Sequence, residues 1–291
     1  MNIADQLEQL RQKVDAYLAG VYQDDVPQKT LYDAMSYSLV AGGKRVRPIL
    51  TMMFAEAAGG DADRALALGC GVEMLHTYSL IHDDLPCMDN DDLRRGKPTN
   101  HVVFGEANAV LAGDALQTAA FETILSADYP AEVRAAAALE LARGVGADGM
   151  CAGQVLDTEG EGKKLTLEEL RLIHEKKTGA LLESACVIGA IAGGASDAQI
   201  AAAHTYAAQV GLAFQIRDDL LDHISTTDAL GKPVGSDDSK HKTTYFTLFG
   251  KEGCEKRIHE STEQAKSAVR GVFAESEPLC AIADWLAGRM N

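Results

Sequence analysis

Residues 170–191 carry a repeated three- and four-residue spacing that constrains the fold more than any other feature of this sequence. The side chains at these steps are Leu170, Ile173, Lys177, Leu181, Ser184, Ile188 and Ile191. This spacing places them on one face of an α-helix, whereas a β-strand would show alternation. Alternation of comparable length appears nowhere in the chain. The pattern therefore predicts helices that pack through one inward face.

Local signals along the rest of the chain also favour helices. Long stretches use Ala, Leu, Glu, Gln and Lys, and the chain contains only 7 prolines, so helix propensity dominates. Thr166-x-x-Glu169 and Ser196-x-x-Gln199 match capping boxes. The glycine-containing breaks are a few residues long, which suits turns better than linkers between domains. We predict an all-α fold of about ten core helices and a single domain over residues 1–291.

The charge balance excludes several classes of function. The chain has 27 Lys and Arg against 43 Asp and Glu, a formal net charge of −16. This excludes binding of nucleic acid by bulk charge and argues against binding to an anionic membrane surface.

The sequence also bears on membrane association and cellular compartment. Residues 1–20 lack a signal-peptide pattern. Residues 198–216 carry too many polar groups for a membrane span, so we expect a buried helix there and no integral membrane association. The 6 cysteines contain no CxxC pair, which predicts ordinary thiols and a cytoplasmic location.

Two acidic clusters, one in each half of the chain, suggest chemistry. The second contains Asp218, Asp219 and Asp222, and Asp218 and Asp222 extend an apolar helix face through Phe214 and Gly211. Carboxylates four residues apart repel each other, so acids on an inward face need a cation. A solvated helix end is the alternative explanation.

The first cluster contains Asp83, Asp84 and Asp89 and follows a helix face that includes His76. Pro86 disturbs the helix at this point, and an exit there would bring the acids together. Carboxylate oxygens with open coordination positions suit Mg²⁺, which takes its other ligands from water and substrate phosphates. The two clusters therefore predict a magnesium site and a phosphorylated substrate.

Basic residues at separate points could hold that phosphate, although any one of them alone is more often simply solvated. They are Lys44, Arg45, Arg47, Arg94, Arg95, Lys97, Lys177, Lys232 and Lys242. Lys177 is the most informative because it interrupts the inward face described above. Arg forks and Lys point charges are the usual ligands of diphosphate groups.

Two other motifs carry no function. Gly144-x-Gly146-x-x-Gly149 matches a dinucleotide fingerprint, but a helical stretch and not a strand precedes it. Glu73-x-x-His76 matches half of a di-iron motif, and no second copy exists in the sequence.

Taken together, these residues resemble the short-chain trans-prenyltransferases, or isoprenyl diphosphate synthases, most closely the bacterial farnesyl diphosphate synthases. Residues Tyr78–His101 resemble the first aspartate-rich motif of that family, including the two-residue insertion typical of bacterial members. The other conserved blocks are matched in order by residues 42–48, 105–117, 149–157, 177–179 and 214–222. The sequence departs from the family at His223, where an apolar residue is usual, and at Phe246, where Pro is common. The roles of His223, Phe246 and Lys242 stay open.

The resemblance implies a homodimer of all-α subunits with a deep central cavity, and about three Mg²⁺ ions per active site. The metal ligands implied are Asp83, Asp84, Asp89 and Asp218, with Asp219 and Asp222 nearby. The catalytic residues implied are Asp83, Asp89, Lys177 and Asp218. The implied contacts on the allylic side are Arg94, Lys177, Thr178, Gln215, Lys232 and Lys242. Those implied for the diphosphate of isopentenyl diphosphate are Lys44, Arg47, His76 and Arg95.

The activity implied is a Mg²⁺-dependent, head-to-tail condensation of isopentenyl diphosphate with dimethylallyl diphosphate and then geranyl diphosphate, giving farnesyl diphosphate. A geranyl or geranylgeranyl diphosphate synthase is the alternative. A terpene cyclase normally has a different second metal motif. A phosphohydrolase built on His82-Asp83 would leave the second acidic cluster unexplained, and intact acids argue against an inactive helical partner subunit.

Two residues compete for the role of setting product length. An ideal helix places Ser79 on the same face as Asp83 and turns Tyr78 away by more than a right angle. The resemblance instead implies Tyr78, because an aromatic residue five positions before the first Asp forms the cavity floor in bacterial farnesyl diphosphate synthases. A core tyrosine packed between helices is the more common fate of such a residue.

Overall fold

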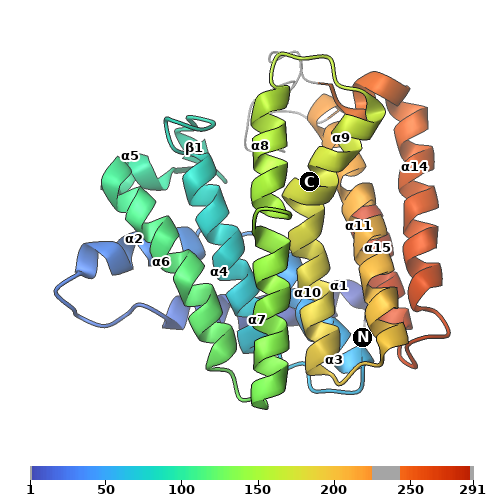
Figure 1. The fold of residues 1–291 in the computed structure, drawn as a ribbon, viewed down its shortest axis with the longest axis horizontal. Coiled ribbons are helices and arrows are strands. Elements are labelled where there is room, and N and C mark those ends of the chain that lie inside the picture. The colour runs from blue at the N-terminus through green and yellow to red at the C-terminus, as the bar shows by residue number, and fades with distance from the viewer. Residues whose placement is uncertain (1, 225–242, 289–291) are drawn as a thin grey trace.

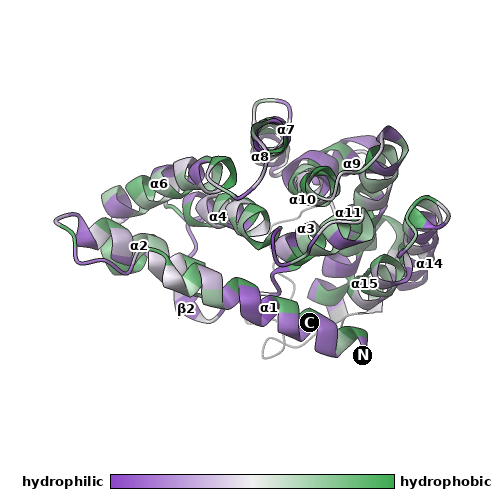
Figure 2. Cartoon of the chain, turned by 90° about the horizontal axis from the view of Figure 1, so that it is seen from below, coloured by the Kyte–Doolittle hydropathy of each residue, from purple (hydrophilic) through white to green (hydrophobic). Residues whose placement is uncertain are grey.

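Helix α3 (Val46–Ala57) lies in the middle of the molecule, and nearly all of its residues are buried. The computed structural model describes residues 2–224 and 243–288. In Figure 2, α3 is surrounded by other helices, with α1 (Ile3–Gly20), α2 (Lys29–Leu39) and α14 (Tyr245–Val269) towards the outside. The main core draws residues from α1 through to α15 (Glu277–Gly288). The assignment of residues 1–291 to a single domain stays a prediction.

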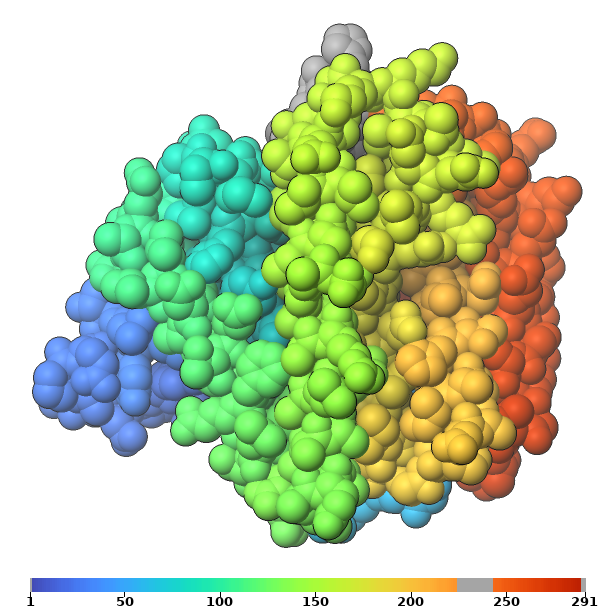
Figure 3. All heavy atoms as spheres, in the orientation of Figure 1, coloured from blue at the N-terminus to red at the C-terminus, as the bar shows by residue number. Residues whose placement is uncertain are grey.

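The all-α prediction is confirmed. The remaining helices, shown in Figure 1, are α4 (Leu66–Asp83), α5 (Asn100–Phe104), α6 (Glu106–Leu125), α7 (Ala131–Val145), α8 (Met150–Gly160), α9 (Leu167–His174), α10 (Ala180–Ala192) and α11 (Asp197–Ile224). A two-stranded antiparallel hairpin, β1 (Leu93–Arg94) and β2 (Lys97–Pro98), follows the first acidic cluster. On the face seen in Figure 3, α7 and α8 form a ridge in front of the other helices.

Both predicted capping boxes form. Glu169 N donates to Thr166 Oγ1 at 3.2 Å, and Thr166 N donates to Glu169 Oε2 at 2.8 Å. Ser196 N donates to Gln199 Oε1 at 2.9 Å, and Gln199 N donates to Ser196 Oγ at 3.4 Å. Each box satisfies backbone N–H groups that the first turn of a helix leaves without intrahelical partners.

The predicted helix over residues 170–191 forms with one difference. A π-helical segment, η1 (Glu175–Gly179), separates α9 from α10 and contains Lys177. At Gly153 of α8, an added Cβ would lie 2.1 Å from the backbone nitrogen of Lys177. The two backbones therefore touch where the helix widens, and such π segments occur frequently at functional sites.

The long uncharged window also behaves as expected, since residues 198–216 lie within α11 and Ala203, Tyr206 and Ala207 are almost completely buried. No helix in the described part of the chain combines the length and apolar character that a membrane span needs. All 6 cysteines are free thiols.

Candidate active site

The first acidic cluster lies where α4 ends. Asp83 is the last residue of α4, and the chain then turns back so that Asp89 N donates to the carbonyl oxygen of Asp83 at 2.8 Å. The carbonyl of Leu85 holds the turn by accepting from Met88 N at 2.8 Å and Asn90 N at 3.1 Å. The helix exit that Pro86 predicted therefore brings Asp89 back to Asp83.

Asp83 is the most electrostatically perturbed acid of this cluster. Burial raises the pKa of its carboxyl to about 6, and the charges of Asp89 and Asp84 add to that rise, while Lys177 and Arg94 oppose it. Removing water penalises a carboxylate unless a cation is nearby. Asp83 and Asp89 together are therefore suited to binding a cation.

Asp84 has a different arrangement, because it pairs with Arg94. Arg94 Nε lies 2.8 Å from Asp84 Oδ1 and 2.9 Å from Oδ2, and Arg94 Nη2 lies 2.6 Å from Oδ1. Only 4% of the Asp84 side chain is exposed. Both oxygens of Asp84 thus accept from a guanidinium fork, which connects the first acidic cluster to the β-hairpin.

The turn of that hairpin separates two adjacent arginines. Arg95 and Gly96 both have positive φ, 53° and 73°, as in the tight turns that suit antiparallel strands. An arginine at positive φ is uncommon and strained. The turn leaves Arg94 on β1, where it pairs with Asp84. Arg95, in the turn, donates to the carbonyl of Gly42 and lines a different cavity.

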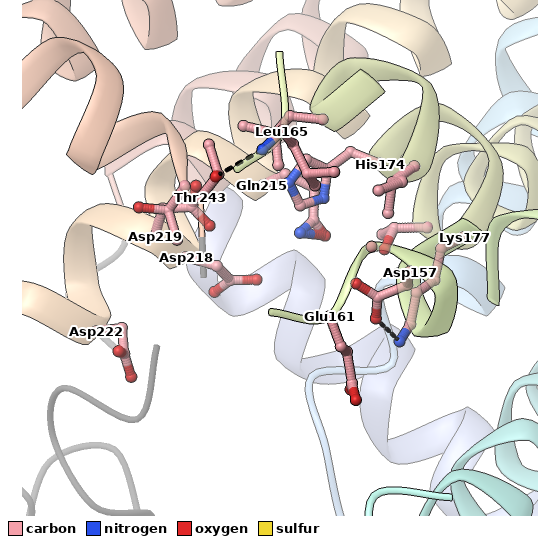
Figure 4. A pocket seen from close by; sticks show the side chains of 15 residues that line it. Asp157, Glu161, Leu165, His174, Lys177, Gln215, Asp218, Asp219, Asp222 and Thr243 are labelled. Atoms are coloured by element: carbon pink, nitrogen blue, oxygen red, sulfur yellow. Dashed lines mark hydrogen bonds and ion pairs between the residues drawn. The ribbon is translucent and has the colours of Figure 1, made fainter. Parts of the chain in front are cut away.

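Asp218 lies in a cavity of about 340 Å³, which we call the acidic cavity. The lining includes Asp157, Lys177, Thr178, Gln215, Asp218, Asp219, Asp222 and Thr243. Figure 4 shows the paired Asp157 and Lys177 on one side and Asp218 facing them from α11. The helix face predicted for the second cluster therefore does point inward.

Lys177 connects the two acidic clusters. Its Nζ donates to Asp157 Oδ2 on α8 at 2.7 Å. Burial is the largest single influence and disfavours its charge, but Asp157, Asp83 and Asp89 together outweigh burial and raise the Lys177 pKa. The first acidic cluster therefore lies within the electrostatic reach of a residue that lines the acidic cavity with Asp218.

Asp219 has a structural contact. Its Oδ2 accepts a hydrogen bond of 2.6 Å from the backbone nitrogen of Tyr245, the first residue of α14. This carboxylate therefore ties the second cluster to the start of α14, where a negative charge is favourable. Beside this contact, the rings of His223 and Phe246 lie with their centroids 3.9 Å apart, so the two departures from the family pattern touch each other.

A second cavity of about 500 Å³ is bordered by the cations Lys44, Arg45, Arg47 and Arg95 and by one acid, Glu73, and we call it the cationic cavity. The four residues implied for isopentenyl diphosphate, Lys44, Arg47, His76 and Arg95, all line it. Gly43 borders it with φ of 135°, and an added Cβ there would lie 2.8 Å from the Arg95 guanidinium. The structure therefore brings these four residues together from three separate segments.

The cationic cavity holds its histidine neutral. Burial lowers the pKa of His76 well below its usual value, and Arg47 and Arg95 lower it further. Burial also lowers the pKa of Arg47 and of Arg95, although Glu73 acts in the opposite direction on both. Concentrated positive charge around a neutral imidazole is an arrangement suited to an anion.

Sequence reasoning missed the role of Glu73. Its Oε1 lies 2.9 Å from Arg45 Nη1, with only 1% of the Arg45 side chain and 3% of the Glu73 side chain exposed. Arg45 also pairs with Asp15 of α1 at 2.8 Å. Arg45 is therefore held by ion pairs within the protein. In the sequence it stands between Lys44 and Arg47, two candidates for binding diphosphate, and no sequence pattern distinguishes it from them.

Tyr78, His82 and Cys151 form a group where α4 contacts α8, and in this group Tyr78 is buried whereas Cys151 is exposed. Tyr78 is 7% exposed, its hydroxyl lies 3.9 Å from Cys151 Sγ on α8, and its ring packs edge-on against His82 at 5.5 Å. His82 Nε2 donates to the carbonyl of Val110 at 3.0 Å. Ser79 is partly buried and its Oγ donates to the carbonyl of His76 at 2.8 Å.

Two predicted residues, Lys232 and Lys242, lie outside the described residues. Within residues 2–224 and 243–288, no three His, Cys, Asp or Glu side chains lie close enough together to form a metal site by themselves. Any cation bound by Asp83, Asp89 and Asp218 would therefore take part of its coordination from other groups.

Comparisons with known proteins identify the same family over most of the chain. Residues 28–275 match the family model described as "Polyprenyl synthetase". The chain is 46% identical over 292 aligned residues to a farnesyl diphosphate synthase of Geobacillus stearothermophilus, covering 99% of this chain and 98% of that protein. It is 47% identical to a chloroplastic geranylgeranyl pyrophosphate synthase of Capsicum annuum, covering 90% of this chain and 72% of that protein.

A solved structure agrees with these sequence comparisons. The crystal structure of an FPP/GFPP synthase from Zymomonas mobilis superposes with a TM-score of 0.86 at 36% identity, covering 98% of each chain.

Proposed function

The chain belongs to the polyprenyl synthetase family, and on this premise we propose that it is a prenyltransferase that makes farnesyl diphosphate. It adds isopentenyl diphosphate head-to-tail to dimethylallyl diphosphate and then to geranyl diphosphate. The observation that carries the proposal is the pair of adjoining cavities: the charged groups that line one are carboxylates and Lys177, and those that line the other are four cations and Glu73. Consecutive residues Phe214 and Gln215 of α11 line the cationic and the acidic cavity respectively.

The acidic cavity and the end of α4 fit Mg²⁺. Asp83, Asp89 and Asp218 would hold it, and the absence of a complete ligand cage among the described residues suits an ion that keeps water and phosphate oxygens as ligands. When bound, Mg²⁺ acts as a Lewis acid towards negative charge on the departing diphosphate. Asp84 is assigned to orienting Arg94, because both of its oxygens already accept from that side chain. The proposed count of about three ions rests on the family.

Each cavity is assigned one substrate. Lys44, Arg47 and Arg95 bind the diphosphate of isopentenyl diphosphate, and neutral His76 donates one N–H to it. Lys177 and Thr178 of η1 contact the allylic diphosphate from the wall opposite Asp218, with Lys177 oriented by Asp157, and Gln215 contacts it from α11. Lys232 is proposed for the same side on family resemblance alone.

The reaction breaks the C–O bond of the allylic diphosphate and forms one C–C bond to isopentenyl diphosphate. The resulting cation then loses a proton, and the released diphosphate, held at short range by the cationic side chains, accepts it. His82 is not the base in this proposal, because its Nε2–H is engaged with the carbonyl of Val110.

The direct test is to incubate the purified protein with isopentenyl and dimethylallyl diphosphates, with Mg²⁺ or with excess chelator, and to identify products by mass spectrometry. We expect farnesyl diphosphate with Mg²⁺ and no product with chelator. Absence of any elongated product with folded protein and Mg²⁺ would overturn the proposal.

Geranylgeranyl diphosphate synthesis is the second candidate, favoured by the similarity to the Capsicum annuum protein. The shorter product is preferred because a bulky, buried Tyr78 lies five residues before Asp83, the place of the cavity floor in bacterial farnesyl diphosphate synthases.

We also propose that the chain works as a homodimer in the cytoplasm. Val102 and Val103 on α5 and Val110 and Leu111 on α6 are between 40% and 55% exposed, and neighbouring exposed apolar residues are typical of interfaces. The 6 free thiols suit a reducing compartment. Sedimentation analysis should give twice the chain mass, and Leu111→Glu should shift it towards the monomer.

A further inference from the structure

We propose that Cys151 is a positioning residue for product length, and that it acts through Tyr78. This inference rests on the proposed function, since it concerns how the same site stops chain growth. The Tyr78 hydroxyl and Cys151 Sγ lie 3.9 Å apart and form a contact between α4 and α8.

The two residues lie at the same depth below the acidic groups. Figure 1 shows α4 and α8 running in the same direction. Tyr78 precedes Asp83 by five residues on α4, and Cys151 precedes Asp157 by six on α8. At a rise of about 1.5 Å per residue, these steps correspond to about 7.5 Å and about 9 Å. Asp83 and Asp157 both raise the pKa of Lys177, so the two distances are counted from residues that lie near the same side chain.

The Tyr78 ring is blocked on its other side. His82 packs edge-on against it and is itself fixed by the hydrogen bond from Nε2 to the carbonyl of Val110. Behind His82, a Cβ added at Gly113 of α6 would lie 2.1 Å from His82 Nε2. The imidazole thus fills the space at Gly113 and cannot retreat from the tyrosine.

The thiol of the exposed Cys151 therefore lies against the hydroxyl end of Tyr78, while His82 packs against its ring. With the sulfur removed, the phenol can tilt towards α8 and the space above it deepens. With a larger side chain at position 151, the phenol is pushed towards the growing chain. Because Tyr78 is itself buried and packed interiors respond to small shifts of a side chain, a displacement of its ring in either direction should alter the length at which growth stops.

The test measures product ratios from isopentenyl and dimethylallyl diphosphates for wild type, Cys151→Ala, Cys151→Ser and Cys151→Phe. We expect Cys151→Ala to raise the C20 to C15 ratio at least threefold, Cys151→Phe to raise the C10 to C15 ratio, and Cys151→Ser, which is nearly the same size, to match wild type. Val155→Ala is the matched control, because Val155, like Cys151, is an exposed residue of α8 and lies one turn further along the helix.

A double-mutant cycle separates this role from a direct contact with the isoprenoid tail. If Cys151 acts through Tyr78, adding Cys151→Ala to Tyr78→Ala should cause no further lengthening. An unchanged ratio in folded, active Cys151→Ala and Cys151→Phe enzymes would overturn the proposal, and so would an additive effect in the double variant. Failure of the wild-type protein to elongate any substrate would instead count against the proposed function.

Discussion

The backbone nitrogen of Asp89 donates a hydrogen bond of 2.8 Å to the carbonyl oxygen of Asp83, at the point where α4 ends. This bond closes the turn that contains Pro86 and returns the third acid of the cluster to the first. In an unbroken helix the two carboxylates would lie on different faces. The helix exit is thus what makes Asp83 and Asp89 usable together.

Replacing Asp83 or Asp218 by Ala should lower kcat by about 100-fold or more at saturating Mg²⁺, because each is proposed to hold the ion that stabilises charge in the transition state. Circular dichroism should show an unchanged helix content. Asp128→Ala is the matched control, since the Asp128 side chain is 99% exposed. Near-normal turnover of Asp218→Ala would contradict a site shared by both acidic clusters.

Gly153→Ala should destabilise the protein and disturb Lys177 together. The added Cβ would lie 2.1 Å from Lys177 N, and overpacking of this kind costs about 1–3 kcal/mol. For a chain of this size we expect Tm to fall by about 2–10 °C, with a higher KM for the allylic substrate. Gly20→Ala provides the comparison, because an added Cβ there meets nothing within 4 Å. Equal Tm values for the two variants would refute the close backbone approach.

His76 should make stability depend on pH in a defined direction. Its folded-state pKa is well below the usual value because of burial and of Arg47, Arg95, Arg94 and Arg45. As pH drops below about 6.5, the unfolded chain therefore binds a proton at His76 that the folded protein does not bind, and the free energy of unfolding falls. Between pH 7.5 and 5.5 this loss amounts to about 1.4 kcal/mol, or about 2–4 °C in Tm.

His76→Gln removes that proton uptake while other titrating groups stay in place. Calorimetric scans at both pH values should therefore show a smaller loss of Tm in the variant than in the wild type. Identical losses would mean that His76 titrates in the folded state as it does in the unfolded chain.

Tyr78→Ala should open the cavity floor and shift the main product from C15 to C20 or longer, whereas Ser79→Phe should shorten it. The reason is that a growing isoprenoid chain stops where a side chain closes its apolar cavity. Product analysis by liquid chromatography and mass spectrometry distinguishes these lengths. If a folded, active Tyr78→Ala enzyme still stops at C15, the floor is another residue, and the segment from Gly105 to Phe121, which includes most of α6, is the next to test.

Much of the local structure was predictable from the sequence because its causes lie within a few residues. The inward face from Leu170 to Ile188 is buried as its spacing predicted, and Thr166 with Glu169 forms the capping box that its four residues encode. The exit at Pro86 follows from the missing backbone N–H and the fixed φ of proline. Fold class was predictable for the same reason, since helical periodicity is a local property.

Only the tertiary structure decided which of several similar charges does what. Asp84 and Asp89 belong to one motif, yet Asp84 pairs with Arg94 while Asp89 returns to Asp83. Asp218 lines the acidic cavity, whereas its neighbour Asp219 accepts from Tyr245 N on α14. Lys44, Arg45 and Arg47 all line the cationic cavity, yet Arg45 is held in ion pairs with Glu73 and Asp15. These partners come from segments that are distant in the sequence. The role of each charged side chain depends on the groups that packing places within a few ångströms of it, and no local sequence pattern encodes those neighbours.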